Sequence, residues 1–339
     1  MILALETSCD DTCAAVITRE GEICSNVISS QGVHDRYGGV VPEIASRHHL
    51  ELIGDVVDDA LASAGIELEQ VELVGVTAGP GLVAALLVGV ATAKALAAVH
   101  RTPLAAVDHL HGHVAASFVV HSDEGWSRPG FEPPFVSLVA SGGHTLLARV
   151  TDHGPHFEVI GTTLDDAAGE AFDKGARLLG LGYPGGAALE RLASDGDPSA
   201  FEFPTASRVS GLDFSFAGLK TALLYRVREL GGAETERRRA DLAASYQRAI
   251  VESLVVRVER ALTRTGMERL AVGGGVAANG HLRERLAELG VTLDVPPREL
   301  CTDNAAMIAS AARFVAPFSY PAYLGLDVYA SGERPLAAA

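Results

Sequence analysis

A pair of histidines at helical spacing is the most chemically informative feature of this 339-residue sequence. His109 and His113 follow Asp108, which can cap a helix, and an apolar segment comes after them. Residues four apart share one face of a helix, so both imidazoles can reach one transition-metal ion, whereas His111 points elsewhere. The same spacing also suits two histidines on an ordinary helix surface. Leu110 stands where a metalloprotease of the HExxH type has its glutamate base, which disfavours that class.

A third metal ligand must come from another part of the chain, and Asp303 is the candidate. It stands at the start of an apolar segment that predicts a helix. An acid there also stabilises a helix N-terminus, and one carboxylate can serve both purposes. Two imidazoles and a carboxylate suit both iron and zinc. We therefore expect one divalent metal per chain, and these residues alone leave iron and zinc open.

Four short turns rich in small residues have the composition of phosphate-binding loops. Phosphate binding needs backbone N–H groups that point inward and no Cβ atom in the way, which glycine turns after strands provide. The segments of this kind are 6–12, 79–81, 141–145 and 273–275. None matches the Walker pattern or a Rossmann GxGxxG with a ribose-binding acid, so a P-loop ATPase and a dehydrogenase are disfavoured.

The same order of segments occurs twice along the chain. Each half begins with a strand, a tight turn and a returning strand, and continues with a strand, a glycine loop and a helix. This repetition predicts a duplicated α/β fold of the actin–sugar kinase–Hsp70 class, with a nucleotide cleft between two lobes. We predict an N-terminal lobe at 1–121, a linker at 122–134, a C-terminal lobe at 135–325 and a tail at 326–339.

The overall composition indicates a cytoplasmic protein that does not bind nucleic acid unaided. The net charge is −16, whereas phosphate neutralisation needs a basic face. We interpret the one run of arginines, at 226–239, as a solvated helix end. The four cysteines form no CxxC pair, the N-terminus does not resemble a signal peptide, and the apolar stretch 81–99 fits a buried helix better than a membrane span.

Taken together, these motifs resemble the TsaD family, the tRNA N6-adenosine threonylcarbamoyltransferases, formerly known as O-sialoglycoprotein endopeptidases. The resemblance runs from Ile2 to about Gly325. The matching segments are Glu6-Thr7-Ser8-Cys9-Asp10, Tyr37-Gly38-Gly39-Val40-Val41-Pro42-Glu43, Thr77-Ala78-Gly79-Pro80-Gly81-Leu82, Ser141-Gly142-Gly143-His144-Thr145, Asp165-Asp166-Ala167-Ala168-Gly169-Glu170-Ala171-Phe172-Asp173, Leu212-Asp213-Phe214-Ser215-Phe216-Ala217-Gly218-Leu219-Lys220 and Cys301-Thr302-Asp303-Asn304.

The resemblance implies the actin-like fold and a defined reaction. The threonylcarbamoyl group moves from threonylcarbamoyl-AMP to N6 of adenosine 37 in tRNAs that read ANN codons. The family's metal ligands correspond to His109, His113 and Asp303. Asp10 corresponds to an acid important for activity, which either accepts the N6 proton or positions the reactants, and Asp11 is the second catalytic candidate. The contacts to bound threonylcarbamoyl-AMP or ATP correspond to Val139, Ala140, Ser141, Gly142, Gly143, Asp173, Gly186 and Asn279.

Two positions depart from the family pattern. His111 replaces an acid that often stands between the metal histidines, and Asp11 replaces a glutamate, which shortens the reach of that carboxylate. The resemblance also implies partners, namely tRNA, a catalytically inactive paralogue and a small ATPase, but no membrane. An ATP-dependent small-molecule kinase on the same fold is the alternative enzyme. A nucleotide-switched assembly protein is the non-enzymatic alternative, and the metal motif argues against it.

Overall fold

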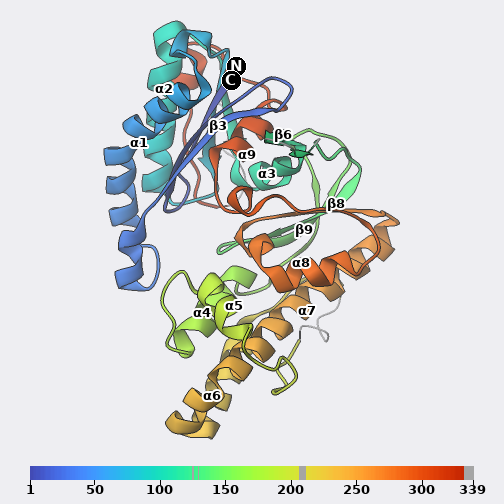
Figure 1. Ribbon diagram of the computed structural model, residues 1–339. Helices are drawn as coiled ribbons and strands as arrows, with labels where there is room; N and C mark the ends of the chain where they lie inside the picture. Colours follow the sequence, from blue (N-terminus) through green and yellow to red (C-terminus); the bar gives the residue numbers. More distant parts are fainter. Residues whose placement is uncertain (124–125, 129, 206–210, 332–339) are drawn as a thin grey trace.

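Two five-stranded sheets of identical topology form the framework of the protein (Figure 1). The computed structural model describes residues 1–123, 126–128, 130–205 and 211–331. The strands of the first sheet, in the order β3-β2-β1-β4-β5, are β1 (Ile2–Glu6), β2 (Asp11–Ile17), β3 (Ile23–Ser30), β4 (Leu73–Gly79) and β5 (Leu104–Asp108). Those of the second, in the order β10-β9-β8-β11-β12, are β8 (Phe135–Ala140), β9 (Thr145–Val150), β10 (Glu158–Thr162), β11 (Arg269–Gly273) and β12 (Thr292–Asp294).

The pairing directions repeat as well. In each sheet the hairpin strands are antiparallel, whereas the two strands that follow a helical crossover are parallel. Parallel neighbours need a long crossover, and helices supply it in both halves. The duplicated α/β fold predicted from the repeated segments is therefore confirmed.

Two long helices cover one face of the first sheet (Figure 1). They are α1 (Pro42–Ala64) and α2 (Val83–His100). By length and composition alone α2 is apolar enough to cross a membrane. Its residues Val90, Ala93 and Ala97, however, are buried against the strands of the sheet. The helix therefore packs as a core helix in the structure, because its small residues let it lie close to β4.

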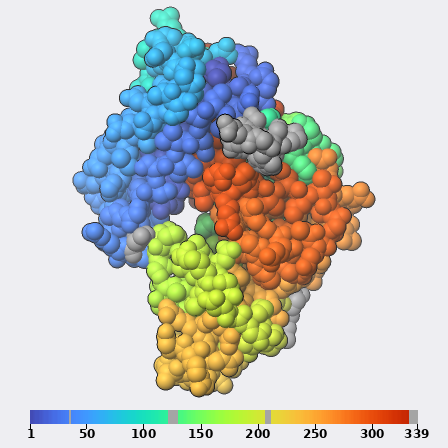
Figure 2. Space-filling model, viewed as in Figure 1, coloured from blue at the N-terminus to red at the C-terminus, as the bar shows by residue number. Residues whose placement is uncertain are grey.

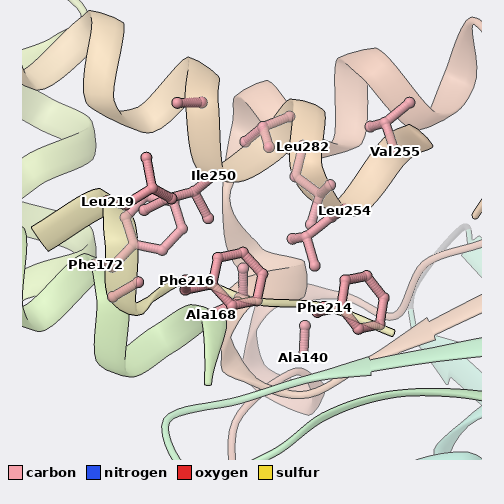
Figure 3. Close-up of a cluster of buried hydrophobic side chains, with 14 of the residues drawn as sticks. Ala140, Ala168, Phe172, Phe214, Phe216, Leu219, Ile250, Leu254, Val255 and Leu282 are labelled. Carbon is pink, nitrogen blue, oxygen red and sulfur yellow. The ribbon is translucent and has the colours of Figure 1, made fainter. Parts of the chain in front are cut away.

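The second lobe is built on a larger aromatic core. Its helices are α4 (Ala168–Leu178), α5 (Gly185–Ala193), α6 (Ala217–Arg237), α7 (Arg239–Thr265) and α8 (Gly280–Ala287). Figure 3 shows Phe172, Phe214 and Phe216 packed against Ile250 and Leu254 of α7. Burying each such ring contributes about 1.5–3 kcal/mol of hydrophobic stabilisation, so this cluster holds the helices of the lobe together.

Two short helices lie between the sheets (Figure 1). They are α3 (His109–Ala115) and α9 (Ala305–Ala312), which pack against each other. Their approach is close, because a Cβ on Gly112 would lie 2.6 Å from the Cδ1 atom of Ile308. The segment after α9 continues along the first lobe, where Phe318 pairs with Leu104. Residues late in the sequence thus contact the first sheet.

Short elements complete the described chain. The short 3-10 helices are η1 (Gly32–Tyr37), η2 (Leu68–Gln70), η3 (Ala116–Phe118), η5 (Gly275–Ala278), η6 (Arg298–Leu300) and η7 (Ala322–Gly325). The predicted linker 122–134 overlaps the hairpin of β6 (His121–Asp123) and β7 (Trp126–Arg128), and its positions 124–125 and 129 lie outside the described residues, as does 332–339 of the predicted tail. The lobe boundaries remain a prediction.

Candidate active site and metal centre

A cleft of about 830 Å³ lies between the two lobes. Figure 2 shows it as an opening bounded by the blue first lobe, the yellow-green segment of α4 and α5, and the red segment near the end of the chain. All four predicted phosphate loops contribute to its wall. The lining from these loops is Ser8, Cys9, Asp10, Asp11, Pro80, Gly81, Ser141, Gly142, Gly143, His144 and Gly275. The repeated hairpins therefore place their turns at one common site.

His109, His113 and Asp303 meet at the wall of this cleft. Their ligating atoms all lie within 4.8 Å of one another. The Nε2 atoms of His109 and His113 are 3.5 and 3.3 Å from Oδ1 of Asp303. Both histidines are buried, at 5% and 2% exposure, which excludes the helix-surface alternative. Two imidazole nitrogens and a carboxylate oxygen facing a common point form a group that can hold a transition metal.

Helix capping explains why these side chains face one another. Asp108 ends β5 and accepts hydrogen bonds from the N–H groups of Leu110 and His111 at 2.8 and 3.1 Å, which starts α3 with both histidines on its inner face. The cap of α9 is Asn304, whose side chain accepts from Met307 N at 3.0 Å. Asp303 is therefore not the cap residue.

Glu6 is a further member of the site that the sequence did not single out. It is fully buried at the end of β1, and its Oε2 lies 3.0 Å from Nδ1 of His109 and accepts from Thr77 Oγ1 at 2.6 Å. With Nδ1–H bound to Glu6, the Nε2 lone pair of His109 is left for a metal. The one available signal was an acid within an otherwise apolar strand.

Burial and charge oppose each other in this cluster. Burial favours the neutral imidazole, but Asp303 and Glu6 outweigh it and raise the pKa of His109 to about 9 in the metal-free protein. Burial would raise the pKa of both carboxyl groups, yet the charge of His109 holds the pKa of Glu6 and of Asp303 below the usual range. The group therefore carries opposite charges that compensate one another without metal.

The turn between β8 and β9 presents bare backbone to the cleft. Ser141 N donates to His144 O at 2.8 Å, and Ser141 Oγ accepts from His144 N at 3.1 Å, which closes the turn. Among the residues that the structure describes, neither Gly142 N–H nor Gly143 N–H donates a hydrogen bond. A Cβ on Gly169 would lie 2.7 Å from Ser141 O, so glycine there lets the N-terminus of α4 approach this turn. The arrangement suits an anion.

Comparison with known proteins decides the family. The profile of the family "TsaD: tRNA N6-adenosine threonylcarbamoyltransferase" matches residues 22–310. The chain belongs to the TsaD family. Proteins named tRNA N6-adenosine threonylcarbamoyltransferase are 46% identical to it in Clostridium novyi, over 98% of both chains, and 51% identical in Symbiobacterium thermophilum, over 93% of this chain and 91% of the relative. The relative in Anaeromyxobacter dehalogenans is 52% identical over 91% and 92%.

Solved structures agree on the fold. HypF from T. kodakarensis has a TM-score of 0.57 at 14% identity, over 92% of this chain and 47% of that chain. Component A of the (R)-2-hydroxyglutaryl-CoA dehydratase from Acidaminococcus fermentans has a TM-score of 0.52 at 14% identity, over 92% and 95%. At this identity the likeness concerns the fold alone.

The two acids that the TsaD resemblance marks as catalytic both line the cleft. Asp11 begins β2, and burial together with the charges of Asp303, Asp10 and Glu6 raises its pKa to about 7 in the metal-free protein. The backbone of Asp10 is held by Gln31, whose N–H donates to Asp10 O at 3.2 Å. The structure thus brings both residues to the cleft that the metal group also lines, and their catalytic roles remain predictions.

The predicted nucleotide contacts divide into two groups. Ser141, Gly142, Gly143 and Asp173 line the cleft, and Asp173 also accepts the N–H of Gly185, the first residue of α5, at 2.8 Å. Burial raises the pKa of Asp173. The remaining four residues are Val139, Ala140, Gly186 and Asn279, and none of them lines the cleft.

Three residues of the second group, Val139, Ala140 and Asn279, have structural roles. The side chains of Val139 and Ala140 lie in the two hydrophobic cores that flank β8. Asn279 is 6% exposed; its Oδ1 caps α8 through Leu282 N at 2.9 Å, and its Nδ2 donates to Gln247 at 2.9 Å. Contacts from these residues to a nucleotide remain predictions.

Two cleft residues were missed among the sequence candidates. His144 stands beside the glycine turn, and burial together with the positive charges of His109 and His113 lowers its pKa to about 4. Tyr183 is a cleft-lining aromatic residue, and burial and the nearby Asp10 raise the pKa of its hydroxyl. Their position beside glycine turns is a weak signal, because such turns are common throughout the chain.

Proposed function

We propose that this protein transfers the threonylcarbamoyl group from threonylcarbamoyl-AMP to N6 of adenosine 37 in tRNAs that read ANN codons. As a member of the TsaD family it is a tRNA N6-adenosine threonylcarbamoyltransferase, and tRNA is its substrate. The observation that carries the proposal is the meeting, in one cleft, of an anion-binding glycine turn and a His-His-Asp group.

The chemistry defines what the site must do. The N6 amine attacks the carbamoyl carbon, the bond from that carbon to the phosphate oxygen breaks, and AMP leaves with the electron pair while N6 loses a proton. The amine is a poor nucleophile because its lone pair is delocalised into the adenine ring. The protein must therefore stabilise charge on the leaving phosphate, accept the proton and hold both reactants in line.

A divalent metal fits the His-His-Asp group. The donor set and the bond from Glu6 to His109 suit iron(II), our first choice, and zinc, the alternative. When bound, such an ion supplies Lewis-acid polarisation. The residues that would hold it are His109, His113 and Asp303.

The remaining steps belong to the chain's own groups. The N–H groups of Gly142 and Gly143 bind the phosphate of the donor and stabilise the charge that it gains on leaving. Asp173 binds the ribose, and the more deeply buried Asn279 supports the base. Asp10 accepts the N6 proton, and Asp11 beside it is the second acid available for that step.

Partner proteins complete the proposal. Arginines in and between α6 and α7 pair with nearby acids. Arg226 of α6 pairs with Glu229 at 2.8 Å, and Arg238, between the two helices, pairs with Asp241 of α7 at 2.6 Å. A chain of net charge −16 with such pairs offers little free positive surface to tRNA. We therefore propose that an inactive paralogue subunit and a small ATPase contribute to tRNA binding and turnover, in the cytoplasm.

A transfer assay tests the function. The protein and its partners are incubated with threonylcarbamoyl-AMP and unmodified tRNA, and the digested nucleosides are analysed by mass spectrometry. We expect N6-threonylcarbamoyladenosine from the wild type and none from the His113→Ala variant. No product from the wild type, where another TsaD protein succeeds, would contradict the proposal and favour the small-molecule kinase, which ADP release with sugars would reveal.

A further inference from the structure

One exposed side chain forms a hydrogen bond between the two lobes. Arg177 lies on α4 of the second lobe, and its Nη2 donates a hydrogen bond to the backbone carbonyl of Gly38 in the first lobe. Arg177 is exposed, so this bond forms in contact with water and is easily broken. We call the Arg177–Gly38 pair the clasp. In Figure 2 the blue and yellow-green surfaces approach each other on one side of the opening.

The backbone at Gly38 is shaped for this contact. Gly38 has φ +66°, in the left-handed region that favours glycine, and a Cβ there would lie 3.5 Å from Arg177 Nη2. It belongs to the segment Tyr37-Gly38-Gly39-Val40-Val41-Pro42-Glu43, one of the motifs by which the chain resembles its family. None of the metal, phosphate or proton-transfer roles assigned above accounts for this segment.

Buried polar side chains connect the same loop to the catalytic turn. His34 Nε2 lies 3.0 Å from Gln31 Oε1, and Gln31 N donates to Asp10 O at 3.2 Å. His49 extends the connection, with Nε2 3.0 Å from Cys9 O. All three residues are buried: His34 and His49 are 0% exposed and Gln31 is 7% exposed. The loop that carries Gly38 is therefore hydrogen-bonded to the backbone of Asp10.

We propose that Arg177 is a positioning residue for the transfer reaction. Through Gly38 it holds the loop of residues 31–41 against the second lobe, and the bond from Gln31 N to Asp10 O connects that loop to the backbone of Asp10. This inference rests on the proposed function. The reaction needs the clasp because the proton acceptor and the phosphate-binding turn come from different lobes, and small errors in the alignment of reacting groups are costly. Arg177 touches neither substrate in this mechanism.

The test compares Arg177→Ala and Arg177→Lys with a matched control, Arg191→Ala, an exposed arginine on the adjacent helix α5. In the complete transfer system we expect Arg177→Ala to lower kcat by about tenfold, with the melting temperature and metal content unchanged. Arg177→Lys, which keeps a charged donor, should recover at least about one third of the rate. Arg191→Ala should match the wild type.

Hydrogen exchange followed by mass spectrometry provides the second readout. In the Arg177→Ala protein the peptide covering residues 31–41 should exchange at least about three times faster, while peptides of α7 stay unchanged. Wild-type kcat together with wild-type exchange at 31–41 would overturn the proposal. If the wild type itself makes no product, the proposed function fails, and unchanged exchange at 31–41 would then still overturn the clasp by itself.

Discussion

The two lobes share one topology but place different chemistry at equivalent positions. The first strand of each hairpin ends in Glu6 in the N-terminal lobe and in Ala140 in the C-terminal lobe. The turn that follows carries carboxylates such as Asp10 in the first lobe, whereas the second offers Gly142 and Gly143. At these equivalent turns one lobe therefore presents charged side chains and the other presents backbone N–H groups.

This difference separates two incompatible requirements. A metal ion and a proton acceptor need carboxylates and imidazoles, whereas the phosphate of an acyl donor is repelled by carboxylates and is bound by N–H groups. Duplication of one lobe lets each half specialise while the cleft brings both sets of groups together. The comparison predicts that substitutions in the two lobes fail in different ways.

The largest effect is expected at the metal group. Asp303→Ala removes the only carboxylate of the His-His-Asp group, while Asn304 still caps α9. Transfer should fall by more than about 100-fold, and circular dichroism should show an intact fold. The measurements are product formation and bound metal by elemental analysis. Normal turnover in this variant would contradict the assignment of Asp303 as a metal ligand.

A smaller loss of activity is expected from Glu6, which contacts the metal ligand His109 but is not itself a ligand. Glu6→Gln removes the charge that orients His109, so metal affinity should fall by about 10- to 100-fold. Excess metal should restore most of the activity. Competition with a chelator measures the affinity, and Ser141→Ala in the other lobe is the control that should leave it unchanged. Equal metal affinity in the Glu6→Gln and wild-type proteins would contradict this prediction.

Substitutions at two glycines of the phosphate-binding region should have different effects, one on donor binding and the other on stability. A Cβ on Gly142 meets open space, so Gly142→Ala should keep the melting temperature and raise the KM for threonylcarbamoyl-AMP by about tenfold. Gly274 has φ +85°, and a Cβ there would lie 2.4 Å from Ala140 O. Gly274→Ala should therefore destabilise the fold by about 1–3 kcal/mol. Thermal unfolding and donor kinetics distinguish the two, and the same loss of stability in both would refute the distinction.

The smallest effect concerns the crowded carboxylates of the first lobe. The pKa of Asp11 is raised to about 7 in the folded, metal-free protein from 3.8, so the folded state keeps a proton that the unfolded chain has lost. The contribution of Asp11 to the free energy of unfolding therefore falls as pH rises from about 4 to about 7, and Asp11→Asn removes that contribution. With a chelator present, we compare the melting temperatures of the variant and the wild type at pH 5 and at pH 8. The difference in favour of the variant should be a few degrees larger at pH 8. An equal difference at both pH values would show that the carboxyl is not perturbed.

Local patterns were sufficient for the fold and for part of the site. The strand–turn–strand repeats and the glycine loops are short-range signals, and the structure contains both sheets that they predict. The spacing of His109 and His113 placed both on one helix face, because four residues make about one turn. The segment 141–145 likewise forms the predicted turn at the cleft.

Other residues show the limit of pattern reasoning. Asn279 is used as a helix cap and as a partner of Gln247, a contact between residues far apart in sequence. Glu6 sits within an apolar strand, and only the arrival of α3 beside it gives its carboxylate a partner. From the sequence, Arg177 is an ordinary helix-surface residue, and only the structure shows that it bonds to Gly38 in the opposite lobe. These roles depend on packing, which neither periodicity nor propensity encodes.

The sequence by itself determined the elements, the duplicated order of those elements and the chemical types available in each turn, because these depend on neighbouring residues. Only the tertiary structure decided which of these groups meet. Asp303 reaches the histidines because α9 packs between the sheets against α3, with glycine at position 112 allowing the close approach. The physical reason is that long-range contacts follow from burying whole faces of helices and sheets, and a single residue's place in the site is a consequence of that burial.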